Sequence, residues 1–256
     1  DLPDELWHDE QFVLGALDEE RRGVRVQMHV PRSMWHDKDF LLETMRRGLY
    51  VHDQIPDELW LDREVVMASG PSWLALEKSF ENRSDREIVL KVAAHANRGA
   101  GFASQYAAPE LWNDRQFVLE AAGLGEPIFQ FAPEFEGDRE VLLAALRGSR
   151  SVLESGQWCD PEIMVSGNVL QFATPELQGD REVVLAAVSS CAQALRYASP
   201  ELRGDAKFVF EAMRQSAKVL LYAADELRFD RDFVLDAVRW NGLALAHGVD
   251  ERRADR

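Results

Sequence analysis

Residues 174–188 read TPELQGDREVVLAAV, residues 199–213 read SPELRGDAKFVFEAM and residues 224–238 read ADELRFDRDFVLDAV. The three stretches share Glu-Leu, an aspartate three residues later, and then a block of three apolar residues. Their aspartates, Asp180, Asp205 and Asp230, are 25 residues apart. A fixed period of this length is the signature of a repeat architecture.

The same motif can be followed towards the N-terminus at intervals of 23 to 29 residues. The gap of 42 residues between Asp138 and Asp180 contains one degenerate copy, in which Asp160-Pro161-Glu162-Ile163-Met164-Val165 replaces the usual block. The sequence therefore predicts a single array of about ten repeats over residues 1–256. Its motif aspartates are Asp9, Asp37, Asp62, Asp85, Asp114, Asp138, Asp160, Asp180, Asp205 and Asp230.

Each motif aspartate precedes a segment with helical periodicity. Apolar residues follow it at positions +3, +4, +7 and +8, as in Val183, Val184, Ala187 and Val188 after Asp180. This spacing places them on one face of an α-helix. The aspartate stands where its carboxylate can accept a free backbone N–H at the helix N-terminus. We therefore interpret the aspartate as a helix cap.

A second, shorter element precedes each aspartate. Ser199-Pro200-Glu201-Leu202 combines a capping residue with proline at a first helical position, which is typical of a short separate turn, and a single 3₁₀ turn is one interpretation of it. Because 25 residues cannot enclose a core, neighbouring repeats must stack. We predict an all-α fold, an α-solenoid with a right-handed superhelix. Ser69-Gly70-Pro71 and Ser166-Gly167 shorten the repeats at Asp62 and Asp160, where we expect bends.

The pattern from Glu176 to Val188, repeated from Glu201 and from Glu226, resembles a tandem repeat family described only as a domain of unknown function, number four-one-one-six. The resemblance extends over nearly the whole chain and is weakest in the first three repeats and at Asp160. It implies helical repeats and brings with it no reaction, cofactor or catalytic residue. The period is also similar to that of the variant leucine-rich repeat, in which α and 3₁₀ helices alternate.

Composition excludes several classes of function. The net charge of −16 repels phosphate backbones, so we expect no nucleic-acid partner. No apolar stretch approaches the roughly 20 residues of a membrane-spanning helix. The only two cysteines, Cys159 and Cys191, do not indicate a disulfide framework, which favours an intracellular location, cytoplasmic or organellar.

We find no pattern that indicates catalysis, a cofactor or a metal. The six histidines show no metal-ligand spacing, and His8 and His36, each directly before a motif aspartate, fit loops near helix N-termini. The repeated Asp-Arg-Glu could suggest calcium or paired acid and base groups, but capping accounts for it. We therefore predict that the chain is not an enzyme.

Aromatic residues recur in two registers. Trp7, Trp35, Trp60 and Trp112 each lie two residues before a motif aspartate, where other repeats carry Arg, Glu or Gln. Such a position should be partly exposed, so these tryptophans are our candidate partner-binding residues, with packing over their own helices as the alternative. Tyr106, Phe172, Tyr197 and Tyr222, each eight residues before an aspartate, are expected to be core residues.

These observations favour a non-catalytic scaffold that binds protein through an extended surface. Its acidity would favour a basic partner surface, or the chain could be an accessory subunit of a larger complex. The alternative is the recruiting module of an enzyme whose catalytic domain lies outside this chain. Because Asp1 falls inside a repeat, we expect the chain to be part of a longer or processed product.

Overall fold

The computed structural model describes residues 4–20, 27–49, 51–70, 72–96, 103–154 and 166–240. Within these ranges every regular element is a helix, and none is a strand. The all-α prediction is therefore confirmed for the described part of the chain. None of the helices in these ranges combines the length and the apolar composition that crossing a membrane requires.

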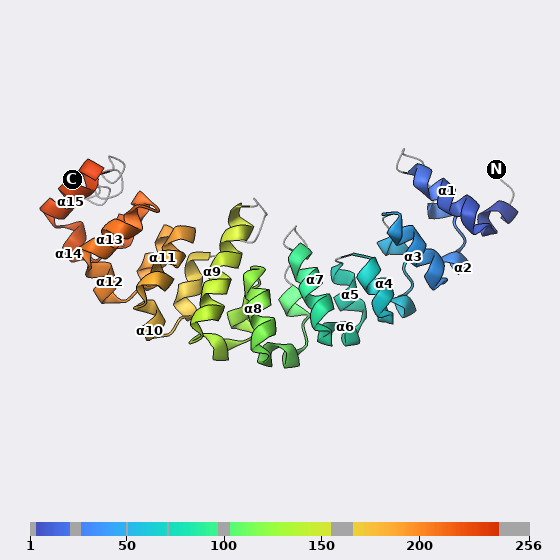
Figure 1. Ribbon diagram of the computed structural model, residues 1–256, viewed down its shortest axis with the longest axis horizontal. Coiled ribbons are helices and arrows are strands. Elements are labelled where there is room, and N and C mark those ends of the chain that lie inside the picture. Colours follow the sequence, from blue (N-terminus) through green and yellow to red (C-terminus); the bar gives the residue numbers. More distant parts are fainter. Residues whose placement is uncertain are drawn as a thin grey trace, which may run out of the picture. The chain divides into compact units, whose positions relative to one another are not determined.

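The helices recur in a three-part pattern, which we call entry helix, turn helix and motif helix (Figure 1). The motif helices follow the aspartates and are α1 (Glu10–Glu20), α3 (Lys38–Arg46), α4 (Arg63–Ala68), α7 (Arg86–Ala96), α8 (Arg115–Gly123), α9 (Arg139–Glu154), α11 (Arg181–Ser190), α13 (Ala206–Met213) and α15 (Arg231–Trp240). The turn helices are η1 (Asp4–His8), α2 (Arg32–Trp35), η4 (Asp57–Leu61), α6 (Phe80–Ser84), η6 (Pro109–Asn113), η8 (Pro133–Phe135), α10 (Pro175–Gln178), α12 (Pro200–Gly204) and α14 (Asp225–Arg228). The entry helices are η2 (Gln27–His29), η3 (His52–Gln54), α5 (Trp73–Lys78), η5 (Ala103–Gln105), η7 (Ile128–Gln130), η9 (Ser166–Phe172), η10 (Ala192–Tyr197) and η11 (Ala217–Tyr222).

This pattern refines the expected helix types. The Pro-Glu turn is a 3₁₀ helix in η6 and η8, as the sequence suggested, but an α-helical turn in α10 and α12. The entry helices η10 and η11 are also 3₁₀ helices. An element of one turn lies close to the boundary between the two hydrogen-bonding patterns, so small differences in geometry decide its class.

The motif aspartates cap the motif helices, as predicted. In the repeat at Asp205, one carboxylate oxygen accepts the backbone N–H of Lys207 at 2.9 Å and that of Phe208 at 3.3 Å. The same oxygen accepts the N–H two residues later in every described repeat: Asp9, Asp37, Asp62, Asp85, Asp114, Asp138, Asp180, Asp205 and Asp230. Asp160 lies outside the described residues.

The apolar face of the motif helices forms the core. Val183, Val184, Ala187 and Val188 of α11 are at most 1% exposed, and the equivalent residues of α13 are buried to the same extent. Burying each larger side chain contributes about 1.5–3 kcal/mol relative to leaving it in water. The helical spacing read from the sequence therefore identifies the core face correctly.

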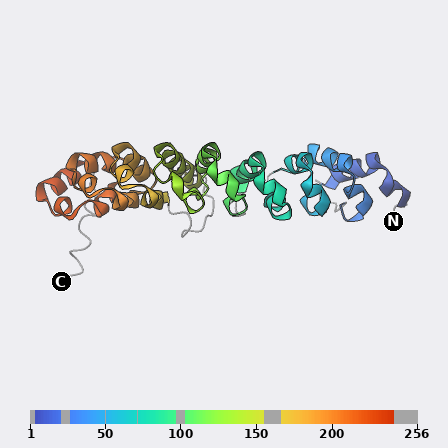
Figure 2. The same cartoon turned by 90° about the horizontal axis from the view of Figure 1, so that it is seen from below.

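The chain divides into two compact units. The N-terminal unit comprises Asp1–Ala96 with Gln105–Ala108, and the C-terminal unit comprises Asn97–Ser104 with Pro109–Arg256. In the C-terminal unit α8 packs against α9, α9 against α11 and α11 against α13, and both views show these helices side by side in chain order (Figures 1 and 2). In the N-terminal unit α3 packs against α4.

The motif helices on either side of the long sequence gap between Asp138 and Asp180 pack directly against each other. Helix α9 contacts α11 directly, and the Nε of Arg139 donates to the carboxylate of Asp180 at 2.9 Å. Helix α9 is 16 residues long, so part of the additional sequence extends this motif helix. The tenth repeat around Asp160 stays a prediction, because residues 155–165 lie outside the described residues.

Neighbouring repeats are also joined by a recurring main-chain hydrogen bond. The carbonyl two residues before one motif aspartate accepts the N–H six residues before the next. This bond joins Ala108 N to Arg83 O, Ser199 N to Gln178 O and Ala224 N to Arg203 O, each at 2.9 Å. The position that carries tryptophan in some repeats therefore lies at the seam between repeats.

Candidate partner-binding surface

The second carboxylate oxygen of the motif aspartates binds a cation from the preceding repeat. Lys38 Nζ lies 2.8 Å from Asp62 Oδ2, and Arg63 Nε lies 2.7 Å from Asp85 Oδ2. In the C-terminal unit Arg115 pairs with Asp138 in the same way. The cation is always the residue directly after a motif aspartate. We call this series of contacts the ladder.

The glutamate two residues after the aspartate completes each step of the ladder. Lys38 also binds Glu64, and Arg115 also binds Glu140. The hydrogen bond from Lys38 lowers the pKa of Asp62, and the one from Arg115 lowers the pKa of Asp138. The repeated Asp-Arg-Glu is thus engaged in capping and in ion pairs between repeats, in agreement with a structural role.

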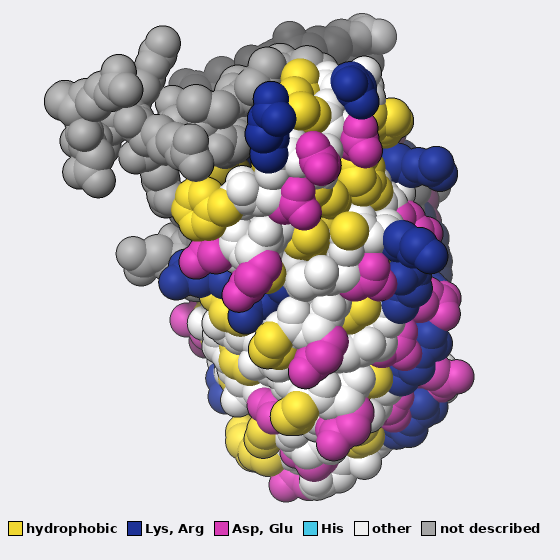
Figure 3. Space-filling model, turned by 90° about the vertical axis from the view of Figure 1, so that its left-hand side faces the viewer, with side chains coloured by type: hydrophobic (Ala, Val, Ile, Leu, Met, Phe, Trp, Pro, Cys, Tyr) yellow, Lys and Arg dark blue, Asp and Glu magenta, His cyan; other side chains and the backbone are white. Residues whose placement is uncertain are grey.

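The ladder changes where the motif changes. Arg181 lies 3.6 Å from Asp205 and pairs with Glu211, because Lys207 replaces the usual glutamate. Ala206 then replaces the usual cation, so this repeat has no side chain with which to continue the series. Figure 3 views the end that carries α14 and α15, and basic side chains gather along one edge of that face with acidic side chains between them.

The candidate tryptophans do not form an exposed ridge. Trp35, Trp60 and Trp112 are only 3%, 2% and 5% exposed, and Trp7 is half-buried. The prediction of partial exposure is therefore wrong for three of the four, and the packing alternative holds. The reason is that the seam offers an apolar slot, which a large indole fills.

Aromatic contacts explain how this slot is closed. The Trp35 ring meets Phe40 edge-on with centroids 5.3 Å apart, and Trp112 meets Phe117 in the same way at 5.1 Å. Trp7 contacts Phe12 at 5.7 Å. In each pair the phenylalanine lies three residues after the motif aspartate, on the core face of the following helix.

The second aromatic register is more exposed than expected. Tyr106, Phe172, Tyr197 and Tyr222 are all half-buried, so their assignment to the core is wrong. They lie at the ends of entry helices, or directly after one, while the adjacent small residues Ala108, Ala173, Ala198 and Ala223 are buried. Part of each of these side chains therefore remains accessible at the surface.

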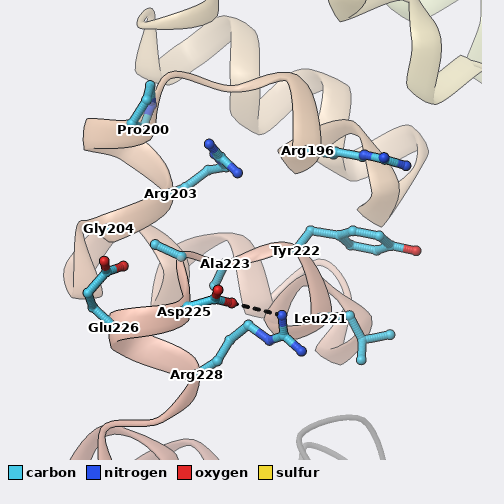
Figure 4. Close-up of a pocket in the computed structure, with 11 residues that line it drawn as sticks. Arg196, Pro200, Arg203, Gly204, Leu221, Tyr222, Ala223, Asp225, Glu226 and Arg228 are labelled. Carbon is cyan, nitrogen blue, oxygen red and sulfur yellow. Dashed lines mark hydrogen bonds and ion pairs between the residues drawn. The ribbon is translucent and has the colours of Figure 1, made fainter. Parts of the chain in front are cut away.

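A groove opens in the C-terminal unit between the repeats at Asp205 and Asp230 (Figure 4). Its volume is about 910 Å³, and it is formed by the entry and turn helices of the two repeats. Three arginines line it: Arg196 from η10, Arg203 from α12 and Arg228 from α14. Tyr222 of η11 lies beside them.

The arginines of the groove differ in their partners. Arg228 Nη1 lies 3.1 Å from Asp225 Oδ1, three residues earlier on the same turn helix. Among the described residues Arg203 Nε is buried without any hydrogen-bond acceptor. Sequence reasoning missed the groove, although part of the signal was present: two consecutive repeats carry arginine, Arg203 and Arg228, at the seam position.

A buried carboxylate outside the motif was also missed. Glu126 is 4% exposed, and it accepts the backbone N–H groups of Ala103 at 3.2 Å and Ser104 at 3.0 Å. Burial raises the pKa of Glu126. Because its oxygens bind the first N–H groups of η5, this residue acts as a cap from outside that helix.

The remaining chemically active residues form no metal centre within the described ranges. His36 Nδ1 lies 2.7 Å from Glu58 Oε1, and both side chains are exposed. Cys191 is a half-buried free thiol, and Cys159 lies outside the described residues.

The family model for a domain of unknown function (DUF4116) matches residues 160–203 and 205–247. These two adjacent matches confirm the family resemblance at the repeats where the motif is clearest. The residues that line the arginine groove fall within these two ranges, its three arginines included, except Gly204, which lies between them. No curated protein and no solved structure matches the chain.

Proposed function

We propose that this chain is a non-catalytic protein-binding scaffold, an α-solenoid of stacked repeats that serves as an accessory subunit of a larger assembly. The stacking is supported by the ladder and by the main-chain bonds at the seams, which join consecutive repeats within each unit. A right-handed superhelix and an intracellular location belong to this proposal.

The observation that carries the proposal is the use of the repeated polar residues. One oxygen of each motif carboxylate accepts backbone N–H groups. In most repeats the other oxygen forms an ion pair with a cation from the preceding repeat. Groups bound in this way are poor candidates for acid–base chemistry. The side chains that remain at the surface include the half-buried aromatic register and the groove arginines, which are residue types enriched in protein interfaces.

The partner is proposed to be protein. With a net charge of −16, the chain would attract a partner with a basic surface through its exposed acidic side chains. The same charge disfavours nucleic acid. If the chain is an accessory subunit, a neighbouring subunit of the complex would supply this basic surface as a permanent partner.

The test is to isolate the tagged full chain from its native cells at physiological salt and to identify the copurifying proteins by mass spectrometry. An unrelated helical protein of similar mass and net charge serves as the control. We expect at least one protein that the control does not retain, and this protein should bind the purified chain in a 1:1 or other fixed ratio. Elution of the native chain alone, at its own mass of 29.1 kDa, would contradict the proposal.

A further inference from the structure

We propose that the groove between the repeats at Asp205 and Asp230 binds an acidic peptide segment of the partner, with Arg203 and Arg196 pairing with its carboxylates. This inference rests on the proposed protein-binding function and specifies the site and the chemistry of the segment bound. The partner as a whole can still carry a basic surface elsewhere.

The first argument is the state of the arginines. Arginines of the ladder are paired with carboxylates, as in Arg115 with Asp138 and Glu140. Arg196 and Arg203 make no ion pair with any residue that the structure describes, although the chain has 45 acidic residues against 29 basic ones. Both guanidinium groups beside the groove are therefore available to a carboxylate of a ligand.

The second argument is a comparison with Arg83, which occupies the same seam position in the N-terminal unit. Its Nε donates to the carbonyl of Leu76 at 2.6 Å, and its guanidinium lies over the Tyr106 ring at 5.8 Å. Arg203 Nε has no such acceptor within the described ranges. A buried donor without a partner costs free energy, so turning this guanidinium towards a bound carboxylate would be favourable.

The third argument is the layout of charge in the groove. In Figure 4 the guanidinium groups of Arg203 and Arg228 enter the space between the two repeats, and Arg196 and Tyr222 extend together on one side. Asp225 is engaged by Arg228, and Glu226 lies on the opposite side. The side that carries Arg196 and Tyr222 is thus cationic with an aromatic wall.

These features select a peptide with carboxylates. A guanidinium binds a carboxylate through two parallel hydrogen bonds, and Tyr222 with Leu221 offers apolar contact to a neighbouring side chain. A long polyanion would meet the net charge of −16 along its length. A short acidic segment meets mainly the local arginines, because charges farther away than about 8 Å are screened at physiological salt.

The experiment selects peptides from a phage-displayed library of random 12-residue sequences on the full chain. The most enriched peptide is then synthesised with a fluorescent label, and its Kd is measured by fluorescence polarisation. We expect enriched peptides to contain several Asp or Glu residues beside an apolar residue. The double variant Arg196→Gln/Arg203→Gln should raise the Kd at least about tenfold, which corresponds to about 1.4 kcal/mol.

The matched control is Arg239→Gln, which removes one cation from exposed α15, outside the groove, and should change the Kd less than about twofold. The groove proposal is overturned if no acidic peptide is enriched, if the peptide with Gln and Asn in place of Glu and Asp binds equally well, or if only a phosphoserine version binds. It also fails if the native partner binds the double variant as well as wild type, which leaves the scaffold proposal intact. Binding of the acidic peptide in the groove, with no copurifying native partner, would support the groove proposal and contradict the scaffold proposal.

Discussion

The seam position two residues before the motif aspartate is filled differently in two regions of the molecule. Trp35, Trp60 and Trp112 occupy it in earlier repeats and are almost completely buried. Arg203 and Arg228 occupy it in the last described repeats and line an open groove. The backbone at this position makes the same hydrogen bond to the next repeat at Arg83, Gln178 and Arg203. The comparison teaches that the same position can hold a buried indole in one region and a groove-lining guanidinium in the other.

The physical difference lies in what each side chain can bury. An indole brings a large apolar area and packs edge-on against the phenylalanine of the following motif helix, as Trp112 does on Phe117. A guanidinium must stay hydrated or find acceptors, so its charged end keeps the seam open. Repeats with tryptophan are therefore expected to be stiffer and repeats with arginine more available for binding.

The largest effect should come from emptying the tryptophan slot. Trp60→Ala should reduce the free energy of unfolding by about 3–5 kcal/mol, because it leaves a cavity in a site that is 2% exposed. Arg203→Ala should cost less than about 1 kcal/mol. Urea denaturation followed by circular dichroism measures both. Equal losses in the two variants would show that the two regions do not differ as described.

A smaller effect is expected from the caps, which both regions share. Asp62→Ala and Asp205→Ala should each cost about 0.5–2 kcal/mol, since each removes an acceptor for two backbone N–H groups. Asp62→Asn and Asp205→Asn should recover most of the loss, because asparagine caps helices equally well. A much larger loss at only one of the two positions would mean that its carboxylate has a further role.

Acid should weaken both regions through the ladder. Hydrogen bonds from Lys38 and Arg115 lower the pKa values of Asp62 and Asp138 in the folded chain. For a lowered pKa, the stabilisation is present above the unfolded value of about 3.8 and is lost as the pH falls through the folded pKa. The urea midpoint should therefore fall as the pH drops below about 4. Asp62→Asn/Asp138→Asn should flatten this decrease, and an unchanged pH profile would exclude the ladder as its source.

The sequence predicts the repeat, the caps and the core face because each depends on local spacing. Asp180 and the apolar residues after it fix a helix start and a buried face within one repeat. The burial of Trp35 and the exposure of Tyr222 depend instead on what the next repeat places opposite them. The variety of residues at the seam suggested exposure for the whole register. In the structure the tryptophans at this position are buried, whereas Arg203 and Arg228 line a groove.

The smallest change in stability, and the sharpest test of the comparison, is expected from Arg203→Trp. This variant gives the C-terminal groove the side chain that closes the seam in earlier repeats, and Phe208 stands three residues after Asp205 as Phe117 does after Asp114. We expect the free energy of unfolding to change by less than about 1 kcal/mol, because new aromatic contact offsets the lost arginine stem. Binding of the acidic peptide should nevertheless weaken, since the cation is gone and the indole occupies the opening. A loss of several kcal/mol in the variant would mean that the seam at Arg203 has no room for an indole, as overpacking of a filled site would produce. In that case the groove would be a separate feature of the last repeats and not the open form of a common slot.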